Sequence, residues 1–209
     1  GLVSGILVGA SAASFVKMTS MPELVALFNG FGGIASLLVG SAEYLGTGSL
    51  GLISLTAIFL TLIIGGITFS GSLVAYGKLS EILPGKQIIF KGQRIVLVAI
   101  FIAALLFGAQ LIFNFQMVEG WNPLFSFLLL ISFSLVIGLL ITLPIGGADM
   151  PVIIALLNSY SGLAASAAGF VINNNVLIVA GALVGASGLI LTNIMCKAMN
   201  RSLANVVFG

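Results

Sequence analysis

Residues 21–40 read MPELVALFNGFGGIASLLVG, and residues 150–169 read MPVIIALLNSYSGLAASAAG. Aligned without a gap, the two segments share Met, Pro, Ala, Leu, Asn, Gly, Ala and Gly, which is eight of twenty positions. Each begins with Met-Pro at a break between apolar runs and carries one asparagine, Asn29 or Asn158, well inside its run. The repetition predicts two similar helices in which one amide serves a shared role.

The composition is that of a membrane protein. Of the 209 residues, 60% are hydrophobic and only 6% are charged, and the mean hydropathy is +1.30. A soluble domain carries about 25% charged residues. A membrane helix needs about 20 apolar residues, and lipid offers no partner for unpaired backbone groups. The long uncharged runs therefore predict an all-α integral membrane protein. The sequence has no cluster of basic residues interleaved with aromatic residues, so nothing in it indicates a nucleic-acid partner.

Seven apolar runs predict a polytopic bundle of about seven transmembrane helices. The first is short for a span, and its small residues recur every four positions. Because the chain starts at Gly1 with no charged segment before this run, we expect an N-terminus that is cut or processed. The runs cover residues 2–16, 22–42, 50–76, 95–115, 124–143, 151–172 and 176–195.

The basic residues predict the orientation of this bundle. With loops placed on alternate sides, one face holds Lys17, Lys78, Lys86, Lys91, Arg94, Lys197 and Arg201, and the other holds Glu43 and Glu119. The positive-inside rule makes the basic face cytoplasmic, or matrix-facing in a mitochondrion. Both copies of the repeat then run outward in parallel. Asn29 and Asn158 lie about 12 Å from the inner end, near the middle of a hydrocarbon core about 30 Å thick.

Two interpretations of the asparagine pair remain open. Interhelical hydrogen bonds from amides commonly hold membrane helices together. Intramembrane polar groups also mark ion or proton routes, although an amide does not titrate near neutral pH and serves only to hold water. The chain has no histidine, which removes the usual proton carrier and the commonest metal ligand. No metal-ligand cluster and no catalytic set is present in the sequence.

The last run and the basic face supply the other candidates. Gly181, Gly185 and Gly188 give a GxxxG-type spacing that favours close helix approach. Ser187 and Thr192 are the hydroxyl candidates beside these glycines. Asp149 is expected first as an N-cap of the sixth run. Lys197 and Arg201 are expected first as snorkelling anchors, but with Asp149 they share the face on which a soluble partner would bind.

Three stretches carry a resemblance to a known family. They are KMTSMPELVALFNGFGGIASLLVG (17–40), GGADMPVIIALLNSYSGLAASAAGF (146–170) and VAGALVGASGLILTNIMCKAMNRSL (179–203). The chain resembles, over essentially its whole length, the β subunit of proton-translocating NAD(P) transhydrogenase. The resemblance implies its membrane domain, without two N-terminal helices and the C-terminal NADP(H)-binding domain.

The resemblance also implies cofactors, partners and a location. This chain would bind no cofactor, because NAD(H) and NADP(H) are held by the soluble domains of the complete enzyme. Its partners would be the membrane helices of an α-type subunit, those soluble domains and the lipid bilayer, in a homodimeric assembly. The location would be a bacterial cytoplasmic membrane or the mitochondrial inner membrane, with the C-terminus on the cytoplasmic or matrix side.

In the family, the membrane domain couples hydride transfer between the two nucleotides to proton translocation. The matching positions are Asn158, Ser187 and Thr192 for the proton path, Gly185 and Gly188 for helix packing or gating, and Asp149, Lys197 and Arg201 for communication with the NADP(H) domain. Asn29, in the first copy of the repeat, is also expected in the proton path. At Asn29 many members have histidine instead. We therefore expect the protonatable group on a helix of the α-type subunit.

Two readings from other classes stand beside this one. One is an ion-coupled secondary transporter with a substrate site at the membrane midplane. The other is a scaffold that only anchors a soluble enzyme. Uptake of a substrate by this chain alone would favour the transporter.

Overall fold

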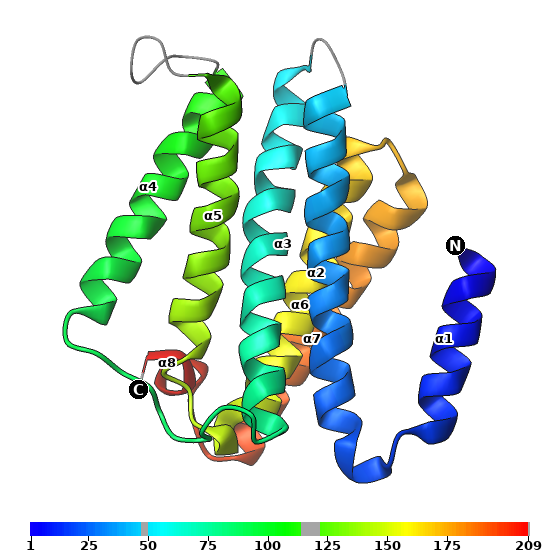
Figure 1. The fold of residues 1–209 in the computed structure, drawn as a ribbon, viewed down its shortest axis with the longest axis vertical. Coiled ribbons are helices and arrows are strands. Elements are labelled where there is room, and N and C mark those ends of the chain that lie inside the picture. Colours follow the sequence, from blue (N-terminus) through cyan, green and yellow to red (C-terminus); the bar gives the residue numbers. More distant parts are fainter. Residues whose placement is uncertain (47–49, 114–121, 209) are drawn as a thin grey trace.

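The computed structural model describes residues 1–46, 50–113 and 122–208, and every regular element in these ranges is helical. The all-α prediction is confirmed for this part of the chain. Figure 1 shows the arrangement. The helices are α1 (Leu2–Phe15), α2 (Met21–Gly46), α3 (Leu52–Leu79), α4 (Gln93–Phe113), α5 (Pro123–Thr142), α6 (Met150–Val171), α7 (Asn175–Ala198) and α8 (Leu203–Phe208), with 3₁₀ turns η1 (Met18–Ser20) and η2 (Gly147–Asp149).

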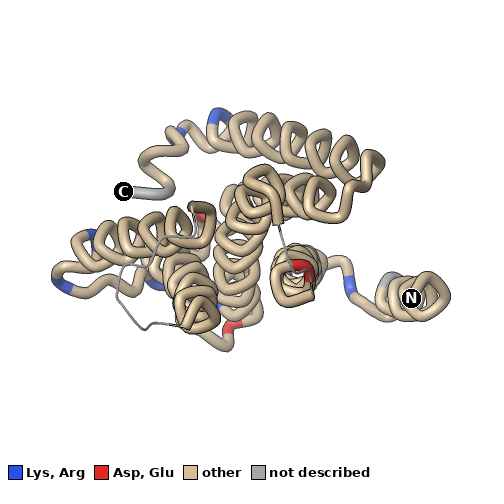
Figure 2. The backbone as a smooth tube through the Cα atoms, turned by 90° about the horizontal axis from the view of Figure 1, so that it is seen from above, with Lys and Arg blue, Asp and Glu red and all other residues tan. Residues whose placement is uncertain are grey.

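Within residues 1–46, 50–113 and 122–208, six helices are long and apolar enough to cross a membrane. These are α2 to α7, and they make this chain an integral membrane protein. The first of the seven predicted runs forms α1, an apolar helix of 14 residues, which is shorter than the about 20 residues of a span. In both views α1 stands apart from the other helices (Figures 1 and 2).

The six long helices run alternately up and down (Figure 1). The starts of α2, α4 and α6 therefore lie at the same end of the bundle as the ends of α3, α5 and α7. All seven lysines and arginines lie in these helix ends or in the segments that join them. We call this end the basic end. Glu43 lies in α2 near the opposite end, and Glu119 falls outside the described residues.

The helix α6 occupies the centre of the bundle and packs against α2, α3 and α7. Its most hydrophobic window is 67% buried, against 39% for α2 and 22% for α7. One cluster of buried residues gathers where α6 begins, and includes Met150, Ile153 and Cys196. A second lies between α3, α4 and α5, and includes Leu62, Ala104 and Leu130. The core thus surrounds α6 and α3.

The two copies of the repeat, in α2 and α6, run in the same direction (Figure 1). Their surroundings differ, because α6 is enclosed by three helices while α2 keeps an exposed face with Phe28, Phe31 and Leu38. Within the described residues, this shared direction is the part of the predicted repeat that the fold shows. The likeness of the two segments is a feature of the sequence.

Candidate functional site

Asn29 joins α2 to α6. Its side-chain Nδ2 donates to the carbonyl of Ile154 at 3.2 Å, and its own carbonyl accepts from Ser161 Oγ at 2.9 Å. The side chain is buried. Ile154 precedes Asn158 by four residues, so Asn29 contacts α6 one helical turn from the second asparagine. At this position the amide serves to hold two helices together.

Asn158 has a different environment. It is half-buried, and its amide has no hydrogen-bond partner among the described residues. Successive helical residues are about 100° apart, which places Asn158 on the strip of α6 between two contact faces. On one side Ser161 bonds to α2, and on the other Ser159 bonds to α7. The amide therefore lies at the edge of the α2–α7 gap.

The helices α6 and α7 meet through small residues. Ser159 Oγ donates to the carbonyl of Gly185 at 2.6 Å, and Ser166 Oγ to that of Ile178 at 3.1 Å. A Cβ added to Gly188 would lie 2.8 Å from Ser159 Cβ. One added to Gly185 would meet the end of the Leu163 side chain at 3.0 Å. Both glycines thus sit in the closest part of this helix pair.

The two hydroxyl candidates on α7 are not brought together. Thr192 is fully buried and donates to the carbonyl of Gly188 at 2.7 Å, within its own helix. Ser187 is exposed and donates to the carbonyl of Val184 at 3.1 Å. It lies two residues after Gly185, which puts it about 200° round the helix. Ser187 therefore faces away from α6 and from Asn158.

Asp149 forms an ion pair at the basic end. Arg201 Nη1 donates to Asp149 Oδ2 at 2.7 Å; the arginine side chain is 52% exposed and the aspartate 9%. Asp149 occupies the N-cap position of α6, but its side chain makes no capping hydrogen bond. The predicted position is thus confirmed, but the capping bond is not formed: Asp149 has helical backbone angles, φ −94° and ψ −2°, where an N-cap residue usually has an extended backbone.

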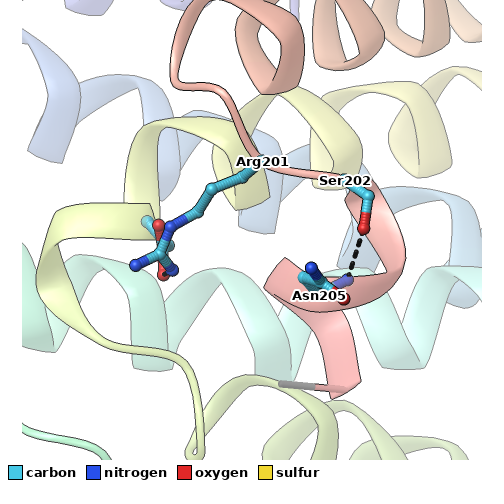
Figure 3. Close-up of polar contacts among 4 residues, drawn as sticks. Arg201, Ser202 and Asn205 are labelled. Carbon is cyan, nitrogen blue, oxygen red and sulfur yellow. Dashed lines mark hydrogen bonds and ion pairs between the residues drawn. The ribbon is translucent and has the colours of Figure 1, made fainter.

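A turn after α7 brings Arg201 to this position. Asn200 has φ of 53°, the left-handed conformation that commonly ends helices, and Arg201 N donates to the carbonyl of Cys196 at 2.9 Å. Figure 3 shows Arg201 extending toward the start of α6, while Asn205 N bonds to Ser202 Oγ at 3.1 Å.

Lys197 lies near the Asp149–Arg201 ion pair but is not part of it. It is exposed and forms no ion pair with a described residue. It lines a recess of about 460 Å³ together with Asn193, Cys196, Asn200, Arg201, Ser202 and Leu203. Within the described ranges, no three His, Cys, Asp or Glu side chains come close enough to hold a metal ion.

One polar residue of the basic end has an environment that sequence reasoning missed. In the prediction from the sequence, Lys78 counted only as one of the basic residues that set the orientation of the bundle. In the structure it is 4% exposed, and its ammonium contacts backbone carbonyls of distant segments. A lysine in the last turn of an apolar helix predicts a side chain that reaches out to solvent. Its partners are main-chain atoms 65 and 67 residues away, and no local pattern indicates them.

The variant Asn29→Ala tests the packing role of the first asparagine. We expect a loss of about 0.6 kcal/mol, which is typical of one interhelical hydrogen bond in a membrane protein. The melting temperature should then fall by only about 2 °C. The loss stays small because the Ile154 carbonyl keeps its bond within α6. Thermal unfolding in detergent measures it, with Ser132→Ala on exposed α5 surface as the control. A fall of 10 °C would contradict a single interhelical bond.

Comparison with known proteins covers the whole chain. The family model described as NAD(P) transhydrogenase beta subunit matches residues 1–209. Two curated relatives named NAD(P) transhydrogenase subunit beta, from Rhodospirillum rubrum and from one of its strains, are each 45% identical over 210 residues. The alignment covers 97% of this chain but 44% of each relative, so the chain spans less than half their length. The chain belongs to the NAD(P) transhydrogenase beta subunit family.

Proposed function

We propose that this chain is the proton-conducting membrane part of a proton-translocating NAD(P) transhydrogenase. The observation that carries the proposal is the amide of Asn158, which is half-buried on the central helix and has no partner among the described residues. A polar group in such a place is expensive unless something else satisfies it. Water, or a residue of a further helix, supplies that partner. The chain itself performs no hydride transfer and holds no nucleotide.

The place of Asn158 supports a path shared with another subunit. Its strip of α6 borders the gap between α2 and α7. A helix of the α-type subunit in this gap would bring a protonatable side chain to Asn158, since the chain has no histidine and Asn29 is engaged with Ile154. In this arrangement Asn158 orients water, and Thr192 lies further along α7 toward the basic end. Ser187 faces the other side of α7 and would act through a different neighbour.

The basic end supports the second half of the proposal, which is coupling to the soluble domains. Asp149 starts α6, the helix that carries Asn158, and Arg201 follows α7. With Lys197 these charges form a surface at the cytoplasmic or matrix side against which an NADP(H)-binding domain docks. Gly185 and Gly188 let α7 move closely along α6 during coupling. The complete assembly would be a homodimer containing the α-type subunit, in a bacterial cytoplasmic or mitochondrial inner membrane.

The test is proton movement by the complete enzyme that contains this chain. Vesicles with a trapped pH-sensitive dye should show a pH change when one reduced and one oxidised nucleotide are added outside, and a protonophore should abolish it. Steady hydride transfer without any pH change would contradict proton conduction. Uptake of a small solute by this chain alone, independent of nucleotides, would favour a secondary transporter.

The ion pair at the basic end gives a further expected result. Arg201→Gln leaves the largely buried Asp149 carboxylate without its cation, but the exposed arginine keeps the loss to about 1 kcal/mol. We expect coupled hydride transfer to fall about fivefold, with nucleotide binding by the soluble domain unchanged. Lys17→Gln, at the same end but away from the pair, is the control. Equal activity of Arg201→Gln and Lys17→Gln would remove the ion pair from the coupling route.

A further inference from the structure

Lys78 is the one buried basic residue of this chain. It lies in the last turn of α3, whereas the other six lysines and arginines are exposed. Burying an ammonium group is costly unless hydrogen bonds replace the water it loses. The position therefore requires a built set of acceptors.

The acceptors are backbone carbonyls that belong to two other segments. Lys78 Nζ donates to the carbonyl of Leu143 at 2.5 Å and to that of Ile145 at 2.6 Å, and it lies 3.4 Å from the carbonyl of Lys86. Leu143 is the C-cap of α5. The carbonyls at a helix C-terminus lack partners within the helix and carry the negative end of its dipole. The ammonium is thus held by the end of α5.

The same two segments are also joined to each other. Ile88 N donates to the carbonyl of Leu143 at 3.2 Å, and Gly147 N donates to that of Gly85 at 2.8 Å. Gln93 Nε2 adds a bond to the carbonyl of Leu140 at 2.9 Å. The segment between α3 and α4 therefore lies against the segment between α5 and α6. Lys78 reaches both.

This contact ends two residues before the ion pair. The segment that begins at Leu143 continues through η2 to Asp149, whose carboxylate meets Arg201. The chain of contacts thus runs from α3 through Lys78 to residues 143–147, then to Asp149 and the segment after α7. The nearest carbonyl bound by Lys78, that of Ile145, lies four residues before Asp149.

We infer that Lys78 is a positioning residue for the coupling machinery. Its ammonium fixes residues 143–147 against the end of α3 and so sets where Asp149 meets Arg201. The local geometry stands by itself, while the effect on coupling rests on the proposed function. Two experiments separate the two claims.

The first experiment measures the local geometry without any activity. A Cβ on Gly147 would lie 3.6 Å from Gly85 Cα, so the Cβ atoms of cysteines at the two positions would be at most about 5 Å apart, near the range that a disulfide spans. Gly85→Cys with Gly147→Cys, in a Cys196→Ala background, should cross-link quickly under mild oxidation in membranes. Adding Lys78→Met, which keeps the side-chain length but removes all three donors, should slow cross-linking at least fivefold. Lys78→Arg should restore much of the rate.

Lys91→Met is the matched control, because Lys91 is an exposed lysine in the segment between α3 and α4 that contains Gly85. It should leave the cross-linking rate unchanged. If Lys78→Met also cross-links at the parental rate, Lys78 does not hold the junction and the inference is overturned. If Lys78→Met fails to accumulate, Lys78→Gln provides the same comparison, since its amide retains only part of the donor set and should give an intermediate rate.

The second experiment asks whether Lys78 acts through the ion pair. Lys78→Met should lower coupled hydride transfer about fivefold, with little change in the KM for either nucleotide. Combined with Arg201→Gln, it should add little further loss, because both changes release Asp149. Independent losses that multiply would show that Lys78 only supports the fold. If Lys78→Met slows cross-linking but leaves coupled hydride transfer unchanged, Lys78 holds the two segments together but does not act on coupling. This outcome does not depend on whether the chain conducts protons.

Discussion

Replacing Gly162 by alanine is expected to force α6 and α7 apart and to lower the melting temperature of the protein by roughly 2–12 °C. A Cβ at Gly162 would lie 2.8 Å from the carbonyl oxygen of Gly181 and closer still to the backbone nitrogen of Gly185. Both obstacles are main chain, so no side-chain rotation relieves the clash. Overpacking of this kind costs about 1–3 kcal/mol, and each kcal/mol corresponds to about 2–4 °C in a protein of this size.

Neighbouring glycines provide an internal scale for this result. Gly181→Ala should be as damaging as Gly162→Ala, because its Cβ would lie 2.6 Å from the carbonyl of Gly162. Gly185→Ala should be milder, since the nearest obstacle is the flexible end of Leu163. Gly9→Ala in α1, where nothing lies within 4 Å, should not lower stability at all. Thermal unfolding in detergent measures all four. An unchanged melting temperature for Gly162→Ala would mean that α6 and α7 are further apart than described.

Helix positions follow from the sequence because apolar length is a local property. The runs at 22–42, 50–76 and 124–143 correspond to α2, α3 and α5, with boundaries that differ by a few residues. The first run forms the helix α1, which has 14 residues. The direction of each helix followed from alternation, and the basic residues all lie at one end.

The partners of polar side chains did not follow from the sequence. Asn29 and Asn158 occupy matching places in two similar segments, yet one donates to Ile154 and the other has no partner among the described residues. Which of these happens depends on the helix that lies opposite, and that is set by long-range packing. Asp149 was likewise predicted as an N-cap. In the structure its carboxylate pairs with Arg201, which lies 52 residues later in the chain.

The distinction between the two asparagines leads to the largest functional effect that we expect. Asn158→Ala should lower proton translocation roughly a hundredfold, the smaller end of what a positioned group contributes to proton transfer. Nucleotide binding by the soluble domain should be unchanged. Stability should also be nearly unchanged, because the Asn158 amide donates no hydrogen bond to a described residue. The dye-loaded vesicles described above measure the proton flux, and thermal unfolding measures the stability.

Asn29→Ala is the matched control for this prediction. It removes an amide of the same kind from α2, where Asn29 contacts α6 one helical turn from Asn158. It should cost a little stability and leave translocation largely intact, which is the opposite pattern to Asn158→Ala. If Asn158→Ala pumps protons normally, Asn158 is not in the path. If instead Asn29→Ala stops translocation at full stability, the proton passes along α2, and the bond to Ile154 must open during the cycle. Because neither amide carries a proton, a path beside Asn158 also requires an Asp, Glu or His on a helix of the partner subunit, and replacing that residue should abolish translocation as Asn158→Ala does.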